Sequence, residues 1–280
     1  MPAPSVPQVD AEWPLALTNA ALAAAMPEAA VRVVVRRLEQ MPLDGREALL
    51  PAVGRDGAPG RYVQQALLAA RPLHVAHATP ASAGGRGWSI VVVRDRLKSL
   101  AAPADATRDG LLAPRVIDGL RCFELRADAS AGGAVQHAAL ANDRALVLAP
   151  SSADLAPIVA KLRRGERSVP ERWAAAAAGV NLEAPLVVLT ADPDRAGLAP
   201  SVAIAVATPV TDAFEAYGVA ADPAGALEEV LRRTGAGEAG VIRRRVRESS
   251  FFLAARFEST GCRDAFIARE LGALSGAEAR

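Results

Sequence analysis

AVQHAALANDRALVLAPSSADLAPIVAKLRRG, residues 134–165, is the stretch whose pattern indicates local structure most clearly. Apolar and polar residues alternate up to the pair Asn142-Asp143, and a second alternating run covers residues 144–149. Alternation with period two is typical of a half-buried strand, and Asn and Asp tolerate the positive φ of a two-residue loop. The stretch therefore predicts a β-hairpin, with His137 on its inward face.

A helix is expected directly after this hairpin. Its apolar residues recur at the i, i+3, i+4 and i+7 spacing of one helix face, namely Leu155, Ile158, Val159 and Leu162. We expect Asp154 to cap its first turn, because Pro157 then falls where a missing N–H costs little, and Gly165 to end it.

The same order of elements recurs near the C-terminus. Residues 239–247 and 250–258 predict a second hairpin, and Thr260 is expected to cap a last helix. Residues 73–164 and 186–274 thus share one order of strands and helices. We predict an α+β protein with an antiparallel sheet, helices on one face and an internally duplicated unit, divided into an N-terminal helical segment (1–71), a first unit (72–180) and a second unit (181–280).

Three segments of mixed pattern are predicted to be helical. Residues 31–38 carry Val31, Val34, Val35 and Leu38 at helical spacing after a good first turn at Pro27 and Glu28. The β-branched run VRVVV fits a strand as well. Residues 111–117 and 211–217 are also interpreted as helices.

Composition excludes several classes of protein. The chain has 280 residues, 51% of them hydrophobic, which suffices for a sizeable core. Its 32 basic and 31 acidic residues nearly balance, so nothing indicates a protein that coats nucleic acid or an anionic membrane. No run of about 20 apolar residues predicts a membrane-spanning helix. No secretory leader is recognised, so the sequence as written indicates the cytoplasm, or the cell envelope if an upstream leader is missing.

Metal and cofactor sites are not indicated. Cys122 and Cys262 are too few for a zinc site and are expected to be free thiols, with a disulfide as the alternative. His74 and His77 lie three apart in an expected strand, so they should point to opposite faces and cannot grip one metal ion. We expect no metal and no cofactor.

The most distinctive polar feature of the sequence is a row of arginines. Arg243, Arg245 and Arg247 would share one face of a strand, about 7 Å apart, and could hold an acidic partner or a phosphate-bearing ligand. They could equally be a solvated face or an edge protected from aggregation by its charge. Together with His137 they are the candidate ligand-binding residues; no catalytic residue can be named.

Two segments resemble a known group of proteins. WSIVVVRDRLKSL and AALANDRALVLAPSSADLAPIVAKLRRG are similar to recurring pieces of a set of bacterial proteins of unknown function, often linked to the cell envelope or to lipoproteins. Shared features are the turn at Asn142-Asp143 and the helix start at Ser151, Ser152 and Asp154. The resemblance implies repeated strand-hairpin-helix units and no catalytic residue. This sequence departs from the group in lacking a leader peptide.

Three hypotheses about function follow. The first is a non-catalytic binding or scaffold protein of bacterial origin, with a protein or small molecule as its partner. The second is a hydrolase or transferase that acts on a small molecule in a cleft between the two units, with His137 or the arginine row engaged. The third is a carrier that encloses an apolar ligand. Whether the protein is an enzyme stays open.

Overall fold

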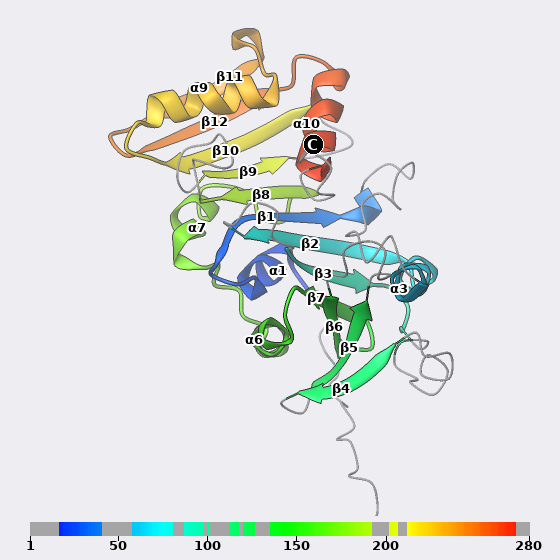
Figure 1. The fold of residues 1–280 in the computed structure, drawn as a ribbon. Coiled ribbons are helices and arrows are strands. Elements are labelled where there is room, and N and C mark those ends of the chain that lie inside the picture. Colours follow the sequence, from blue (N-terminus) through cyan, green and yellow to red (C-terminus); the bar gives the residue numbers. More distant parts are fainter. Residues whose placement is uncertain are drawn as a thin grey trace, which may run out of the picture.

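The fold is built on one large antiparallel sheet. In the computed structural model, which describes residues 17–40, 58–80, 87–97, 100, 112–117, 120–126, 135–191, 202–206 and 212–272, twelve strands form a single sheet. Every strand pair in it is antiparallel. Figure 1 shows the sheet running from β11 at one end to β4 at the other.

The strands follow the sheet in an order that differs from the chain order. From one edge to the other they are β11 (Val241–Val246), β12 (Ser250–Arg256), β10 (Ala213–Val219), β9 (Val202–Val206), β8 (Leu186–Thr190), β1 (Ala30–Arg37), β2 (Pro72–Pro80), β3 (Trp88–Val93), β7 (Ala145–Ala149), β6 (Val135–Asn142), β5 (Leu120–Arg126) and β4 (Ala113–Ile117).

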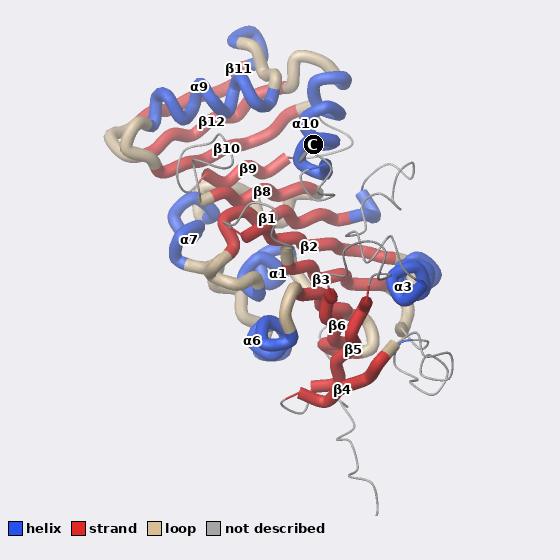
Figure 2. The backbone as a smooth tube through the Cα atoms, viewed as in Figure 1, coloured by secondary structure: helices blue, strands red, loops and turns tan. Residues whose placement is uncertain are grey.

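Helices cover both faces of the sheet (Figure 2). The first face carries α1 (Asn19–Ala25), α6 (Ser152–Arg164) and α7 (Glu171–Ala177) over one apolar cluster. The second face carries α3 (Ala58–Ala69) over another cluster, and α9 (Pro223–Thr234) and α10 (Thr260–Gly272) over a third. Short 3-10 helices cover Leu38–Gln40 and Glu238–Gly240.

The α+β class with an antiparallel sheet is confirmed, but the prediction of helices on one face is wrong. The strands β3, β7 and β8 are buried at every position. Side chains of a strand alternate between the two faces, so such strands need an apolar cover on each face. Helices therefore pack on both faces of the sheet.

The predicted helix over residues 31–38 is wrong, because the strand β1 lies there. It pairs with β2 on one side and β8 on the other, and so joins strands from the two predicted units. The spacing of its valines fits a helix and a strand alike, and pairing on both edges decides for the strand because β-branched residues pack well on a pleated surface. The interpretations of 111–117 and 211–217 as helices are also wrong, since β4 and β10 lie there.

The hairpin and helix that start the sequence argument are confirmed. Asn142 of β6 pairs with Ala145 of β7, so the two-residue turn is Asp143-Arg144, one residue later than predicted, and neither Asn142 nor Asp143 has the expected positive φ. The side-chain oxygen of Asn142 accepts a hydrogen bond from the Arg144 amide at 2.8 Å. The helix α6 ends at Gly165 in the left-handed conformation, with φ of 63°. Its N-cap is Ser151 rather than Asp154; the Ser151 hydroxyl donates to the Asp154 carboxylate at 2.8 Å.

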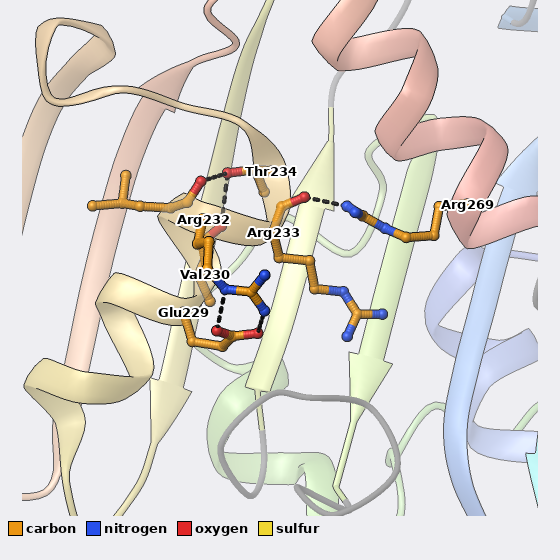
Figure 3. A network of polar contacts seen from close by, with 7 residues as sticks. Glu229, Val230, Arg232, Arg233, Thr234 and Arg269 are labelled. Atoms are coloured by element: carbon orange, nitrogen blue, oxygen red, sulfur yellow. Dashed lines mark hydrogen bonds and ion pairs between the residues drawn. The ribbon is translucent and has the colours of Figure 1, made fainter.

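The second hairpin is also confirmed, and two helices cover one side of it. Figure 3 shows how the end of α9 is held: the Thr234 hydroxyl donates to the Val230 carbonyl at 2.7 Å, and Arg269 of α10 donates to the Arg233 carbonyl. Phe257 and Phe266 stack with ring centroids 5.7 Å apart. The helices α9 and α10 therefore cover the hairpin β11–β12 on the second face of the sheet.

The internal duplication and the unit boundaries stay predictions.

Candidate functional site

The predicted arginine row lies at an edge of the sheet. The strand β11 is the last strand of the sheet order and pairs with β12. The hairpin closes at Arg247, whose amide donates to the Ser250 carbonyl at 2.7 Å. Every residue from 242 to 249 is exposed, so the row is presented to solvent.

Register with β12 shows which side chains share a face. Arg243 lies opposite Ala254 and Arg245 opposite Phe252, whereas Arg244 lies opposite Leu253 in the core of the second face. Opposed residues of an antiparallel pair project to the same face. Arg243 and Arg245 therefore stand on the first face, as the sequence predicted, and Arg244 on the second.

The arginines line a pocket of about 270 Å³ on the first face. Its lining comes from the segment that follows α7, from β10 and from the hairpin β11–β12 with its turn, and consists of Gly179, Tyr217, Arg243, Arg245, Arg247, Ser250, Phe251 and Phe252. The guanidinium carbon of Arg243 lies 6.0 Å from the centroid of the Phe252 ring, a cation–π distance. Guanidinium groups and two aromatic rings, Tyr217 and Phe252, thus border one space.

Gly179 shapes the wall of this pocket. A Cβ atom placed on Gly179 would lie 2.1 Å from Cγ of Tyr217, so the ring packs directly on the backbone at the end of α7. Tyr217 also contacts the apolar cluster of the first face. The position of this ring therefore depends on a residue without a side chain.

The three pocket arginines carry charge that is not neutralised within the described part of the chain. Arg244 pairs with Glu238 at 3.1 Å on the other face, and no acidic group of the described residues pairs with Arg243, Arg245 or Arg247. Residues 241–256 contain five arginines and one glutamate, although the whole chain has a net charge of +1. Positive charge is thus concentrated at this edge.

His137 lies far from the arginine row in the sheet. It stands on β6, opposite Glu124 of β5 and Ala149 of β7, and eight strands separate β6 from β11 in the sheet order. It is partly buried on the first face, whose cluster includes Ala149. The predicted set of four ligand-binding residues is therefore not one site: the structure brings the arginines together and leaves His137 apart.

A second polar cluster lies at the centre of the second face. Arg32 and Arg36 of β1 alternate with Val34, and Arg36 lies opposite Val75 and Leu186, at the junction of the two apolar clusters of that face. Arg36 is fully buried, and none of its three guanidinium nitrogens has a hydrogen-bond partner among the residues that the structure describes. Burial, aided by the charge of Arg32, lowers the pKa of Arg36 to about 9, so it keeps its charge at neutral pH.

His77 belongs to the same cluster. Its Nδ1 lies 2.8 Å from the Ser89 hydroxyl oxygen, and it is opposite Val34 in the register of β1 and β2. Burial, together with the charges of Arg36 and Arg32, lowers the pKa of His77 to about 3. His77 is therefore neutral at physiological pH.

His74 lies on the other face from His77, as predicted. It pairs in register with Arg37 and Val92, and Val92 belongs to the cluster of the first face. Burial and the charge of Arg37 lower the pKa of His74 to about 4. Among the described residues no three His, Cys, Asp or Glu side chains gather as metal ligands, and Cys122 and Cys262 are free thiols.

The cluster of Arg32, Arg36 and His77 was not predicted from the sequence. A signal was present, because Arg32, Val34 and Arg36 alternate with Val33 and Val35 at period two. The valines of the same segment also have helical spacing, and this spacing led to the prediction of a helix instead of a strand. A strand reading of residues 30–37 would have placed both arginines on one face.

Comparison with known proteins shows the fold alone. Neither a family model nor a curated protein matches the sequence. The solved structure of TP0453 in crystal form I is similar, with a TM-score of 0.52 over 90% of this chain and 96% of that chain, at 9% sequence identity. None of the described helices is long and apolar enough to cross a membrane. The geometry of the arginine pocket, rather than any relative, has to indicate what the protein does.

Proposed function

We propose that this protein is a binding protein that recognises an acidic ligand at the arginine pocket of β11. The single observation that carries the proposal is the gathering of Arg243, Arg245 and Arg247 around one pocket without a carboxylate of the described chain to neutralise them. Carboxylates and phosphates are the groups that a guanidinium holds best, because its fork donates two parallel hydrogen bonds.

The lining residues indicate the kind of ligand. Tyr217 and Phe252 offer ring faces beside the guanidinium groups, so a ligand with an aromatic or apolar part next to its anionic group gains contact area. At about 270 Å³ the pocket suits a single side chain or head group rather than a large cofactor. The ligand class is therefore a carboxylate or phosphate carried on a small apolar group.

The other hypotheses fit this pocket less well. Its described lining offers hydrogen-bond donors and rings, and contains no histidine, cysteine or carboxylate that could pair with Ser250 for catalysis. It lies at one end of the sheet, away from β1, where the two predicted units meet. If the arginines only protect the edge strand from aggregation, they should have no affinity for anions. A measured affinity therefore distinguishes an anion-binding site from a protective charged edge.

A binding measurement with two small anions tests the proposal. We expect phenyl phosphate to bind more tightly than inorganic phosphate in titration calorimetry at low salt, because its ring contacts Tyr217 and Phe252. Arg245→Gln and Arg243→Gln should each weaken phenyl phosphate binding about tenfold or more, since a charge-assisted hydrogen bond contributes about 1.5–3 kcal/mol.

Arg244→Gln is the matched control. It removes the same charge from the same strand, but its side chain lies on the opposite face and pairs with Glu238. Binding should be nearly unchanged in this variant. No detectable binding of either anion, or equal weakening by all three substitutions, would contradict a specific anion-binding site. The arginines would then be only a solvated, charged edge of the sheet.

The family and the compartment stay proposals drawn from the sequence. A bacterial envelope-linked protein with a longer, processed N-terminus and a cytoplasmic protein that begins at this Met1 make opposite predictions for cell fractionation of the native protein. The intact mass of the N-terminus in each fraction separates them.

A further inference from the structure

The outer edge of β11 offers main-chain groups to a partner. In an antiparallel pair, successive residues point their N–H and C=O groups alternately toward the neighbouring strand and away from it. The Arg247 amide points toward β12, where it donates to Ser250, and Arg245 follows two residues away in the same phase. The N–H and C=O groups of Arg244 and Val246 therefore point outward.

This edge is exposed to solvent in the described part of the chain. Ile242 and Val246 are 59% and 47% exposed, the highest values besides Val116 among the described large apolar residues. Exposed edge strands with apolar residues are templates for another strand, and most proteins cover or shorten them. Here the edge combines free main-chain groups, exposed apolar side chains and a row of charges of one sign.

We propose that the partner is an extended acidic segment of another protein that adds to β11 as a thirteenth strand. The inference rests on the proposed function and names the partner of that same site. Acidic residues at alternate positions of such a strand would recur about every 7 Å, the spacing of Arg243, Arg245 and Arg247 along β11. Main-chain hydrogen bonds supply affinity in this mode, and the side chains supply specificity.

The second face of the added strand would meet different chemistry. Its intervening residues would lie beside Val246 and beside Arg244, whose charge is neutralised by Glu238. Apolar or β-branched residues fit there, and they also favour the extended conformation. The preferred motif is therefore acidic-apolar-acidic-apolar-acidic.

A second copy of this chain fits the edge poorly. An antiparallel pairing of two β11 strands by their outer edges would place the two arginine rows on the same face, opposite one another. Like charges directly opposite each other destabilise a strand pair. Charge complementarity therefore selects an acidic strand of a different sequence.

The experiment uses a short acetylated peptide with Glu at three alternate positions and Val or Thr between them. A matched peptide carries the same residues with the three Glu in a row. Two further peptides carry N-methyl groups on one or the other alternating set of amides. We expect the alternating peptide to bind more tightly than the matched peptide, by about tenfold or more in fluorescence anisotropy. One of the two methylated peptides should lose this gain, because only one set of amides faces β11.

Val246→Pro tests the same inference from the protein side. Proline removes the outward N–H of residue 246, which no pairing with β12 uses, and prolines are tolerated on sheet edges. It should weaken peptide binding about tenfold while phenyl phosphate binding stays at the wild-type value. Arg245→Gln should weaken both ligands.

The outcomes separate the two proposals. If neither methylated peptide differs from the parent, strand addition is wrong, and phenyl phosphate binding still supports the anion pocket. If neither peptide nor phenyl phosphate binds, both proposals fail. If Val246→Pro does not fold, the methylated peptides decide alone, because they leave the protein unchanged.

Discussion

At the scale of single residues, the polar cluster of the second face dominates the energetics. Arg36 and His77 are both buried near a sheet centre, and the structure keeps one charged and the other neutral. Burying a charge without a partner costs several kcal/mol, whereas a neutral imidazole with a hydrogen bond is tolerated. Two predictions about stability follow from this difference.

His77 should make the protein less stable in mild acid. Its pKa is about 3 in the folded protein and 6.5 in the unfolded chain, so between these values the unfolded chain binds more protons. Stability is full above pH 6.5 and falls as the pH drops toward 3. Chemical denaturation at pH 7.5 and pH 5 should show a loss of about 2 kcal/mol from this residue.

His77→Asn isolates that contribution, because asparagine does not titrate and can still bond with the Ser89 hydroxyl. The loss between the two pH values should shrink by about 2 kcal/mol in the variant. His74, with its pKa lowered to about 4, acts in the same direction and accounts for part of what is left. An unchanged pH dependence would contradict a buried neutral His77.

Arg36→Met should stabilise the protein. The buried guanidinium has no hydrogen-bond partner in the described part of the chain, and its pKa of about 9 means that its charge destabilises the folded state below that pH. Methionine is apolar and similar in length, so the free energy of unfolding should rise by about 1–4 kcal/mol in urea denaturation. Arg96→Met, an exposed control, should change it by less than about 0.5 kcal/mol. A loss of stability in R36M would contradict an unpaired, destabilising charge at this position.

At the scale of elements, the site depends on how α7 ends against β10. Gly179 allows the Tyr217 ring to lie against the backbone, and this ring borders the arginine pocket. The hairpin β11–β12 carries the charges, while α9 and α10 hold its other side. The site is therefore an assembly of one helix end and one hairpin.

Gly179→Ala should weaken both stability and binding. Its new Cβ would collide with the Tyr217 ring, which has to move into the pocket or out of the core. We expect a loss of about 1–3 kcal/mol in the free energy of unfolding, the usual cost of overpacking, together with weaker phenyl phosphate binding. Ala178→Ser, at the exposed neighbouring position, should leave both within error. Wild-type binding in G179A would show that the ring does not contribute to the pocket.

At the scale of the whole molecule, one sheet connects everything. The strand β1 lies between β8 and β2, so residues from the start of the chain join its two predicted units. The arginine pocket and His137 lie on one face but toward opposite ends of this sheet. The strand β11, which carries the proposed binding site, thus lies at the edge of one continuous sheet.

The features that could be predicted from the sequence are those that depend on residues close together in the chain. Both hairpins follow from period two and a two-residue turn, α6 and α9 from one apolar face, and the arginine row from its spacing on a strand. In each case the decisive interactions join residues that are close in the chain.

Features that depend on residues far apart in the chain could not be predicted and became clear only from the three-dimensional fold. The valines of residues 31–35 fit a helix until β2 and β8 pair on either side of them, and Arg36 is buried because of that pairing. Gly179 and Phe252 come from different parts of the chain, and no spacing in the sequence indicates that they border one pocket. Long-range strand order sets these neighbours, because main-chain pairing is the same for any sequence and leaves no local signal of which strands meet.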